Sequence, residues 1–158
     1  LSKLLFERNA NLIISNIGKD SIDQLKRDKI SFNESDINSI FEQKCDIISP
    51  CALGGVINSE TKKKLKCKAI VGAANNQLDK SETALWLKEN NIFYAPDYLV
   101  NAGGVIAISC EINNSEDTMD NQLNKISDKV LSLLKESKKS NLSTDKIVED
   151  LAWKRINI

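Results

Sequence analysis

Four short apolar runs, separated by polar segments, constrain the fold of this chain more strongly than any other feature. The runs cover residues 11–15, 45–49, 68–74 and 92–96. Apolar runs of this length, bounded by turn-forming residues, are typical of buried strands. The segments around them carry helical spacing, and we expect helices or helical turns at residues 1–8, 21–29, 59–66, 80–91, 119–139 and 144–156.

The alternation of strands and helices, about every 25 residues, predicts βαβ crossovers. Such crossovers build a parallel sheet covered on both faces, so we expect an α/β, doubly wound sheet followed by C-terminal helices. Ser21 and Ser81 are the expected N-caps of two helices, because a hydroxyl there can accept from exposed backbone N–H groups. The periodicity of residues 103–112 leaves helix and strand both open.

The composition argues against several classes of protein. Lys plus Arg equals Asp plus Glu at 22 each, so no charge surplus favours nucleic acid or an anionic membrane as a partner. No apolar run approaches the ~20 residues that a membrane-spanning helix needs. The 158 residues, 41% of them hydrophobic, predict one globular domain or slightly more.

The cysteines bear on the redox environment of the protein, and the first residue bears on how the chain begins. Cys45, Cys51, Cys67 and Cys110 show no Cys-x-x-Cys spacing, and the chain has no histidine, so we expect no metal site. A reduced, cytoplasmic protein is the simplest interpretation. The chain starts at Leu1 rather than Met and carries no charged-then-apolar leader, so we interpret this start as truncated.

Small, turn-forming and amide residues follow each predicted strand. The strand ends are Asn16, "PCALGG" at 50–55, "ANNQ" at 74–77 and "PDYLVNAGG" at 96–104. Ligands of open parallel sheets bind outside the carboxyl ends of the strands. We therefore expect a binding rim here, where two Gly-Gly pairs would let a ligand approach the backbone closely.

If the rim binds a dinucleotide cofactor, each part of the rim would contact a particular group of that cofactor. Asn16 would follow the second strand of such a fold, where a side chain hydrogen-bonds the adenosine ribose. The carboxamides of Asn75, Asn76 and Asn101 can donate and accept at once, which suits a nicotinamide carboxamide or a ribose. A turn or helix cap at Asn75 and Asn76, and ordinary turns at the glycine pairs, stay open as alternatives.

Two further features favour ordinary structural roles. Cys51 follows a strand end, which would suit a nucleophile, but the chain has no histidine to activate it. We favour a structural or backbone-contact role for this thiol. The lysine clusters at 62–64 and 138–139 are typical of solvated helix faces.

Three blocks of residues point to a family. "CDIISPCALGGVIN", "GAANNQL" and "APDYLVNAGGVI", in this order and at this spacing, closely resemble the cofactor domain of the leucine, valine and phenylalanine dehydrogenases, which share a superfamily with glutamate dehydrogenase. Weaker likeness extends over both ends, so the resemblance covers essentially the whole chain. It implies a Rossmann-like NAD-binding domain at residues 1–115 and a C-terminal helical segment at 116–158.

The resemblance also implies an activity and its residues. Family members reversibly deaminate an L-amino acid to the 2-oxo acid and ammonia, with hydride passing to NAD. By position, Cys51 and Ala52 match the loop that lies along the cofactor. Asn75 and Asn76 match its neighbour near the nicotinamide ribose, and Asn101 matches the junction of nicotinamide and substrate.

Three positions bear on specificity through the same resemblance. Val105 and Ile108, one turn apart on the helix that Gly103 and Gly104 would open, match the substrate side-chain pocket, and their aliphatic character favours a branched-chain substrate. Asn16 occupies the place where the family usually has an aspartate on the adenosine ribose. An amide keeps the hydrogen bonds without the charge that repels a 2′-phosphate, so NADP stays open beside NAD.

The resemblance implies further parts that these residues do not supply. They are the first strand, the Gly-x-Gly-x-x-Gly loop and the N-terminal substrate domain, which holds the family's catalytic lysine and aspartate. We therefore assign no catalytic residue, and we expect residues 1–158 alone to be inactive and marginally stable. The complete protein is expected to be a homo-oligomer. The alternatives are a non-catalytic nucleotide-binding module, a phenylalanine or glutamate dehydrogenase, and an opine or hydroxy-acid oxidoreductase on the same scaffold.

Overall fold

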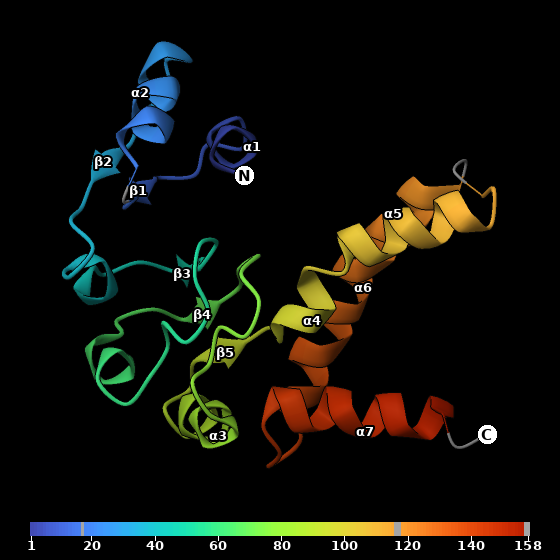
Figure 1. The fold of residues 1–158 in the computed structure, drawn as a ribbon. Helices are drawn as coiled ribbons and strands as arrows, with labels where there is room; N and C mark the ends of the chain where they lie inside the picture. The colour runs from blue at the N-terminus through green and yellow to red at the C-terminus, as the bar shows by residue number, and fades with distance from the viewer. Residues whose placement is uncertain (17, 116–117, 157–158) are drawn as a thin grey trace. The chain divides into compact units, whose positions relative to one another are not determined.

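The computed structural model describes residues 1–16, 18–115 and 118–156, drawn in Figure 1. These residues divide into two compact units, Leu1–Gln43 and Lys44–Ile158. Both units contain parallel strands joined through helical segments, which confirms the α/β class. The domain boundary expected between residues 115 and 116 adjoins residues 116–117, which lie outside the described ranges, and that division stays a prediction.

The Leu1–Gln43 unit is built around one pair of parallel strands. Ile13 lies opposite Asn33 in this pair, and the connecting helix buries Ile22. The second strand of the pair was not predicted, because both of its residues are polar and exposed. The elements are α1 (Ser2–Phe6), β1 (Ile13–Ile14), α2 (Lys19–Arg27), β2 (Asn33–Glu34) and the 3-10 turn η1 (Ile40–Glu42).

The Lys44–Ile158 unit contains a three-stranded parallel sheet in the order β3-β4-β5. Ile70 on the central strand pairs with Ile48 on one side and Tyr94 on the other. The elements are β3 (Ile47–Ile48), the 3-10 turn η2 (Thr61–Lys64), β4 (Ala69–Ile70), α3 (Ser81–Glu89), β5 (Phe93–Tyr94), α4 (Asp97–Val100), α5 (Gly103–Ile112), α6 (Met119–Ser137) and α7 (Thr144–Ile156).

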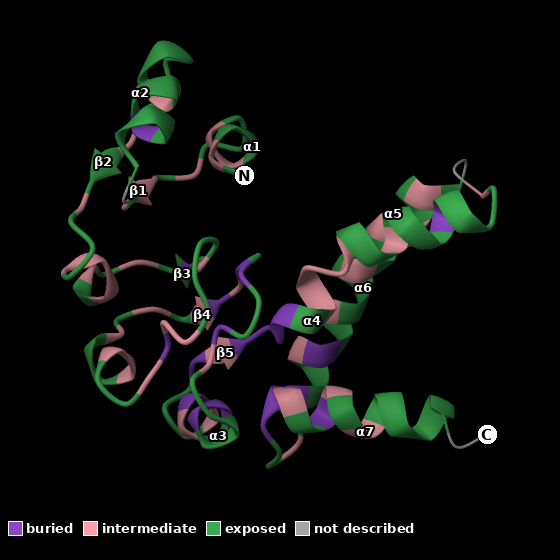
Figure 2. Cartoon of the chain, in the orientation of Figure 1, coloured by how far each residue is buried: buried purple, intermediate pink, exposed green. Residues whose placement is uncertain are grey.

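The core of the larger unit lies between its sheet and helix α3. Ile57, Ile70 and Leu87 are completely buried, and Figure 2 shows the buried residues gathered at β4, β5, α3 and the start of α7. Helix α3 packs against both β5 and α7, while α6 packs against α4, α5 and α7. The C-terminal helices therefore fold onto the strand-bearing part of this unit.

The predicted elements are present, but their ends differ from the predictions. Each strand is only two residues long, so the predicted strands are shorter than the apolar runs that predicted them. Neither expected serine is an N-cap: α2 begins after Gly18, and α3 begins after Lys80 with Ser81 as its first residue. Residues 103–112, which periodicity left open, form helix α5. None of the helices in the described ranges has the length and apolar character for a membrane crossing.

Candidate functional site

The loops that follow β3, β4 and β5 meet at one edge of the sheet. The strands run parallel, so their carboxyl ends lie together, as the sequence predicted. The backbone N–H of Ala74 donates to the Pro50 carbonyl at 3.0 Å, and that of Gly55 donates to the Asn76 carbonyl at 2.7 Å. The loop after β3 is therefore bonded directly to the loop after β4.

Two glycines make this close contact between the loops possible. A Cβ on Gly72 would overlap the Pro50 carbonyl, and a Cβ on Gly54 would lie 2.7 Å from the Asn75 carbonyl oxygen. The chain bends at this pair, and Gly55 adopts a left-handed φ of 67°, which glycine accepts without steric cost. Gly54 thus serves the packing of one loop on another, whereas the sequence had suggested close approach of a ligand.

The side chains of Asn75 and Asn101 form a carboxamide pair across two of these loops. Asn101 Nδ2 donates to Asn75 Oδ1 at 2.6 Å. A carboxamide has two donor hydrogens and one acceptor oxygen, so this bond leaves the Asn75 NH₂ and the Asn101 oxygen available. Asn75 is exposed and Asn101 is half-buried, so the pair lies at the surface of the rim.

The neighbouring Asn76 contributes to the rim through its backbone. It forms a turn with φ of 51°, a left-handed conformation that asparagine tolerates better than most residues. Its N–H donates to Asp97 Oδ2 at 2.8 Å. The turn that the sequence left open beside the cofactor interpretation is therefore present at this position, and it does not cap a helix.

Asp97 and Tyr94 were not predicted as site residues, yet they support this turn. Asp97 is 9% exposed, and its Oδ1 accepts from the Tyr94 hydroxyl at 2.9 Å. Burial, and secondly the bond to Asp97, raises the pKa of Tyr94 well above its usual value, so the hydroxyl stays protonated and donates. A carboxylate directly after a buried strand was the available sequence signal for this support.

Gln77 is a second residue that sequence reasoning missed. Its side chain is completely buried, and its Nε2 donates to the carbonyls of Gly72 and Ala74 at 2.7 and 3.0 Å. These bonds close the turn that carries Asn75 and Asn76. Its Oε1 has no hydrogen-bond partner among the described residues.

Of the other predicted cofactor residues, two lie on the loop after β3 and one follows β1. Cys51 and Ala52 are exposed on the loop after β3, where Cys51 Sγ is 3.4 Å from the Ser49 hydroxyl. Asn16 follows β1 in the Leu1–Gln43 unit and is described within that unit alone, where its Nδ2 donates to the Gly18 carbonyl at 2.9 Å. The structure thus brings the loops of 51–52, 75–76 and 101 to one sheet edge.

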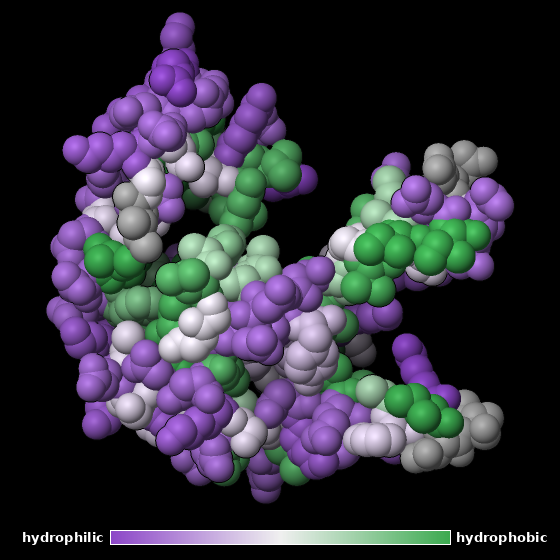
Figure 3. All heavy atoms as spheres, in the orientation of Figure 1, coloured by the Kyte–Doolittle hydropathy of each residue, from purple (hydrophilic) through white to green (hydrophobic). Residues whose placement is uncertain are grey.

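The two predicted substrate-pocket residues are exposed on α5. Val105 and Ile108 are 72% and 59% exposed, and Ile112 continues the same apolar stripe. Figure 3 shows hydrophobic atoms gathered along this helix. Exposed aliphatic side chains at this spacing form a surface that can receive an apolar group.

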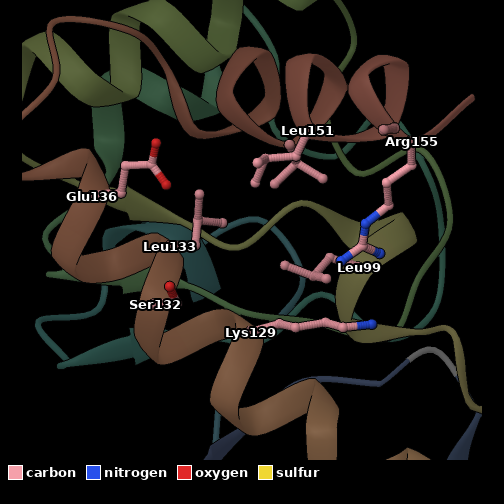
Figure 4. A pocket seen from close by; sticks show the side chains of 9 residues that line it. Leu99, Lys129, Ser132, Leu133, Glu136, Leu151 and Arg155 are labelled. Carbon is pink, nitrogen blue, oxygen red and sulfur yellow. The ribbon is translucent and has the colours of Figure 1, made fainter. Parts of the chain in front are cut away.

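A groove elsewhere in the larger unit contains none of the predicted site residues. It has a volume of about 260 Å³ and lies between α4, α6 and α7. Figure 4 shows Leu99, Leu133 and Leu151 converging there from the three helices, with Lys129 and Arg155 beside them.

Together, the parallel strands and the helices that connect them define a domain of the α/β class. The sequence profile described as Glutamate/Leucine/Phenylalanine/Valine dehydrogenase matches residues 8–152. The chain belongs to this family.

Individual relatives agree with this assignment. The chain is 37% identical to a leucine dehydrogenase of Thermoactinomyces intermedius, over 100% of this chain and 43% of that protein. It is 38% identical to a phenylalanine dehydrogenase of the same organism, over 99% and 43%. The crystal structure of L-tryptophan dehydrogenase from Nostoc punctiforme superposes with a TM-score of 0.93 at 33% identity, over 99% of this chain and 48% of that one. The chain thus spans less than half the length of these relatives.

Proposed function

We propose that this chain is the cofactor-binding part of an NAD-dependent L-amino acid dehydrogenase, which reversibly converts its substrate to the 2-oxo acid and ammonia. The bound NAD would supply the acceptor for hydride from the substrate. The observation that carries the proposal is the Asn75–Asn101 pair at the carboxyl edge of a parallel sheet. Its available NH₂ and oxygen match the acceptor and donor of a carboxamide, so the donor set fits the nicotinamide group.

The rim residues would then contact different parts of the bound cofactor. Cys51 and Ala52 would lie along it, and Asn75 and Asn76 would lie near the nicotinamide ribose. Asn101 would bind where nicotinamide meets substrate. These assignments follow the family resemblance and agree with the shared edge on which the three loops lie.

We infer a branched-chain aliphatic substrate from Val105 and Ile108. Both are aliphatic and exposed on α5, the helix that begins directly after Asn101 and Ala102. An apolar side chain of the substrate would be removed from water there, which is favourable, whereas a charged one would lose hydration. The leucine and phenylalanine dehydrogenase relatives are equally similar in sequence, so identity alone does not decide between their substrates.

At the adenosine end of the cofactor, Asn16 is compatible with both NAD and NADP. It presents a neutral amide, which would bind ribose hydroxyls without repelling a 2′-phosphate. We propose NAD as the cofactor from the family resemblance. Replacement of Asn16 by Asp should therefore raise the ratio of NAD to NADP activity, and an unchanged ratio would place this residue away from the ribose.

We assign no catalytic residue in the chain. A general base needs a pKa near the working pH. The pKa values of Lys68 and Lys146 are shifted in the opposite direction, because each ammonium donates to carboxylates that stabilise its charged form. Lys68 donates to Asp46, and Lys146 donates to Glu149 and Asp150. We expect residues 1–158 alone to bind cofactor without turnover, because the family resemblance places the catalytic lysine and aspartate in the N-terminal substrate domain. We also propose that the complete protein is cytoplasmic and forms a homo-oligomer. Cell fractionation would test the location, and light scattering would measure the mass of the assembly.

An activity screen tests the proposed function directly. The protein expressed from its complete open reading frame is mixed with leucine, valine, phenylalanine, tryptophan or glutamate, each with NAD and with NADP. We expect reduced cofactor to form fastest with leucine or valine. Saturable NADH binding without any turnover would instead favour a non-catalytic nucleotide-binding module, and reduction with hydroxy acids alone would favour a different oxidoreductase.

A further inference from the structure

Helix α4 holds the 75–76 turn from both of its ends. At its first residue, the Asp97 carboxylate accepts from the Asn76 backbone N–H at 2.8 Å. Directly after its last residue, Asn101 donates its side-chain amide to Asn75 at 2.6 Å. The Asn101 N–H also donates to the Asp97 carbonyl at 2.8 Å, which ties the two ends together. One short helix therefore fixes both the backbone and a side chain of the turn.

Asp97 is bonded through both carboxylate oxygens, although it is buried. Its Oδ2 accepts from Asn76, and its Oδ1 accepts from the Tyr94 hydroxyl at 2.9 Å. Its own N–H donates back to the Tyr94 oxygen at 3.3 Å. A buried carboxylate costs free energy unless such donors satisfy it, and charge-assisted bonds are stronger than neutral ones. Asp97 is thus a firm anchor beneath an exposed turn.

The turn needs such an anchor because its conformation is not intrinsically favoured. Asn76 is left-handed, and its carbonyl accepts from Gly55 on the neighbouring loop at 2.7 Å. Loss of the Asp97 bond would leave the Asn76 N–H without its carboxylate acceptor and the turn freer to rotate. The adjacent Asn75 side chain would then lose its fixed direction toward Asn101.

We propose that Asp97 is a positioning residue that orients the Asn75–Asn101 carboxamide pair for the nicotinamide end of the cofactor. This inference rests on the proposed function, because it takes the pair as the contact to nicotinamide. Asp97 acts through the Asn76 backbone and not by touching the cofactor. The role follows from a buried, doubly bonded carboxylate beneath two exposed amides.

The inference predicts an effect confined to one end of the cofactor. ADP lacks both nicotinamide and the ribose that carries it, so its affinity should not depend on the pair. In the protein expressed from its complete open reading frame, Asp97→Asn should weaken NADH binding about tenfold, the scale of one charge-assisted hydrogen bond, and leave ADP binding unchanged. Calorimetric titration measures both affinities on the same preparation.

A matched control and a second variant complete the experiment. Asp46→Asn makes the same chemical change at an exposed carboxylate that accepts from Lys68 at 2.7 Å, and it should alter neither affinity. Tyr94→Phe removes one donor to Asp97 but keeps the carboxylate and the ring. It should weaken NADH binding about threefold, as expected for one neutral donor, and it tests the inference even if Asp97→Asn does not fold.

The outcomes separate the inference from the function on which it rests. If the wild-type protein binds neither NADH nor ADP, the proposed function is wrong. If it binds both, and Asp97→Asn or Tyr94→Phe weakens both equally or weakens neither, the positioning role is wrong. Selective loss of NADH affinity with retained ADP affinity supports the role.

Discussion

The two units of the chain bury unequal cores although both follow the same βαβ pattern. Of the fourteen buried hydrophobic residues among those described, Ile22 and Ile30 belong to Leu1–Gln43 and the other twelve to Lys44–Ile158. The smaller unit has a single pair of two-residue strands, whereas the larger has a central strand paired on both sides. A lone strand pair is marginally stable in water. The alternation of strands and helices therefore determines the topology of both units, whereas the stability of each unit depends on how many strands pair with each of its strands.

The largest difference between the units should come from removing a core side chain. Ile70→Ala deletes a completely buried side chain on the central strand, and it should lower the free energy of unfolding by about 4 kcal/mol. Ile13→Ala, at the half-buried strand of the smaller unit, should cost only about 1 kcal/mol. Urea denaturation of both variants measures the two losses. Equal losses would mean that the units have equivalent cores.

A similar contrast is expected for glycine substitutions. Gly72→Ala places a Cβ against the Pro50 carbonyl and should destabilise the larger unit by about 3 kcal/mol, because backbone cannot give way cheaply. Gly18→Ala meets only the Asn16 side chain at 3.7 Å, so it should cost less than about 1 kcal/mol. Thermal melting of the pair checks this prediction, and a tolerated Gly72→Ala would contradict the close packing of the rim loops.

Hydrogen exchange should resolve the same difference without substitution. The N–H groups of Val71 and Ala95 donate across the central strand, to Ile48 and Ile70. Those of Asn33 and Ser35 donate within the lone pair of the smaller unit. We expect the first two amides to exchange at least about 30-fold more slowly, since local opening costs more where more core surrounds a strand. Mass spectrometry of peptic fragments would detect this, and matched rates would remove the distinction.

The smallest effect concerns two cysteines within the larger unit. Burial, and secondly the neighbouring Cys45, raises the pKa of Cys67 to about 11, whereas Cys51 is exposed at the rim. Iodoacetamide at pH 8 should therefore alkylate Cys51 well before Cys67. The raised pKa also means that the folded state keeps a proton which the unfolded state releases near pH 9. Stability should consequently fall as the pH rises from about 9 to 11.

The sequence allowed the strands and the binding edge to be predicted, because both depend on local patterns. Apolar runs gave β1, β3, β4 and β5, and the residues after them gave the rim. Strand β2 has no such signal, since Asn33 and Glu34 are polar and exposed on both faces. Strand ends were placed too late, because the chain leaves the sheet where one loop packs on another, as Gly72 does on Pro50.

The contacts that organise the site could not be predicted from local pattern. Asp97 accepts from Asn76 across 21 positions of sequence, and Asn101 donates to Asn75 across 26. No periodicity connects residues that far apart, because such pairs form only when parallel strands bring separate loops to one edge. Gln77 was overlooked for a related reason: an amide that follows two asparagines in a loop gives no sign that it will be buried and bonded to Gly72 and Ala74.

Titration of the protein with NADH, beside its Asn101→Ala variant, tests the central claim most directly. The claim is that the carboxyl edge of the Lys44–Ile158 unit binds the nicotinamide end of the cofactor through the Asn75–Asn101 pair. We predict saturable binding that weakens about tenfold in Asn101→Ala, the scale of a lost hydrogen bond together with its unpaired partner. NADH binding of equal affinity in both proteins would contradict the account.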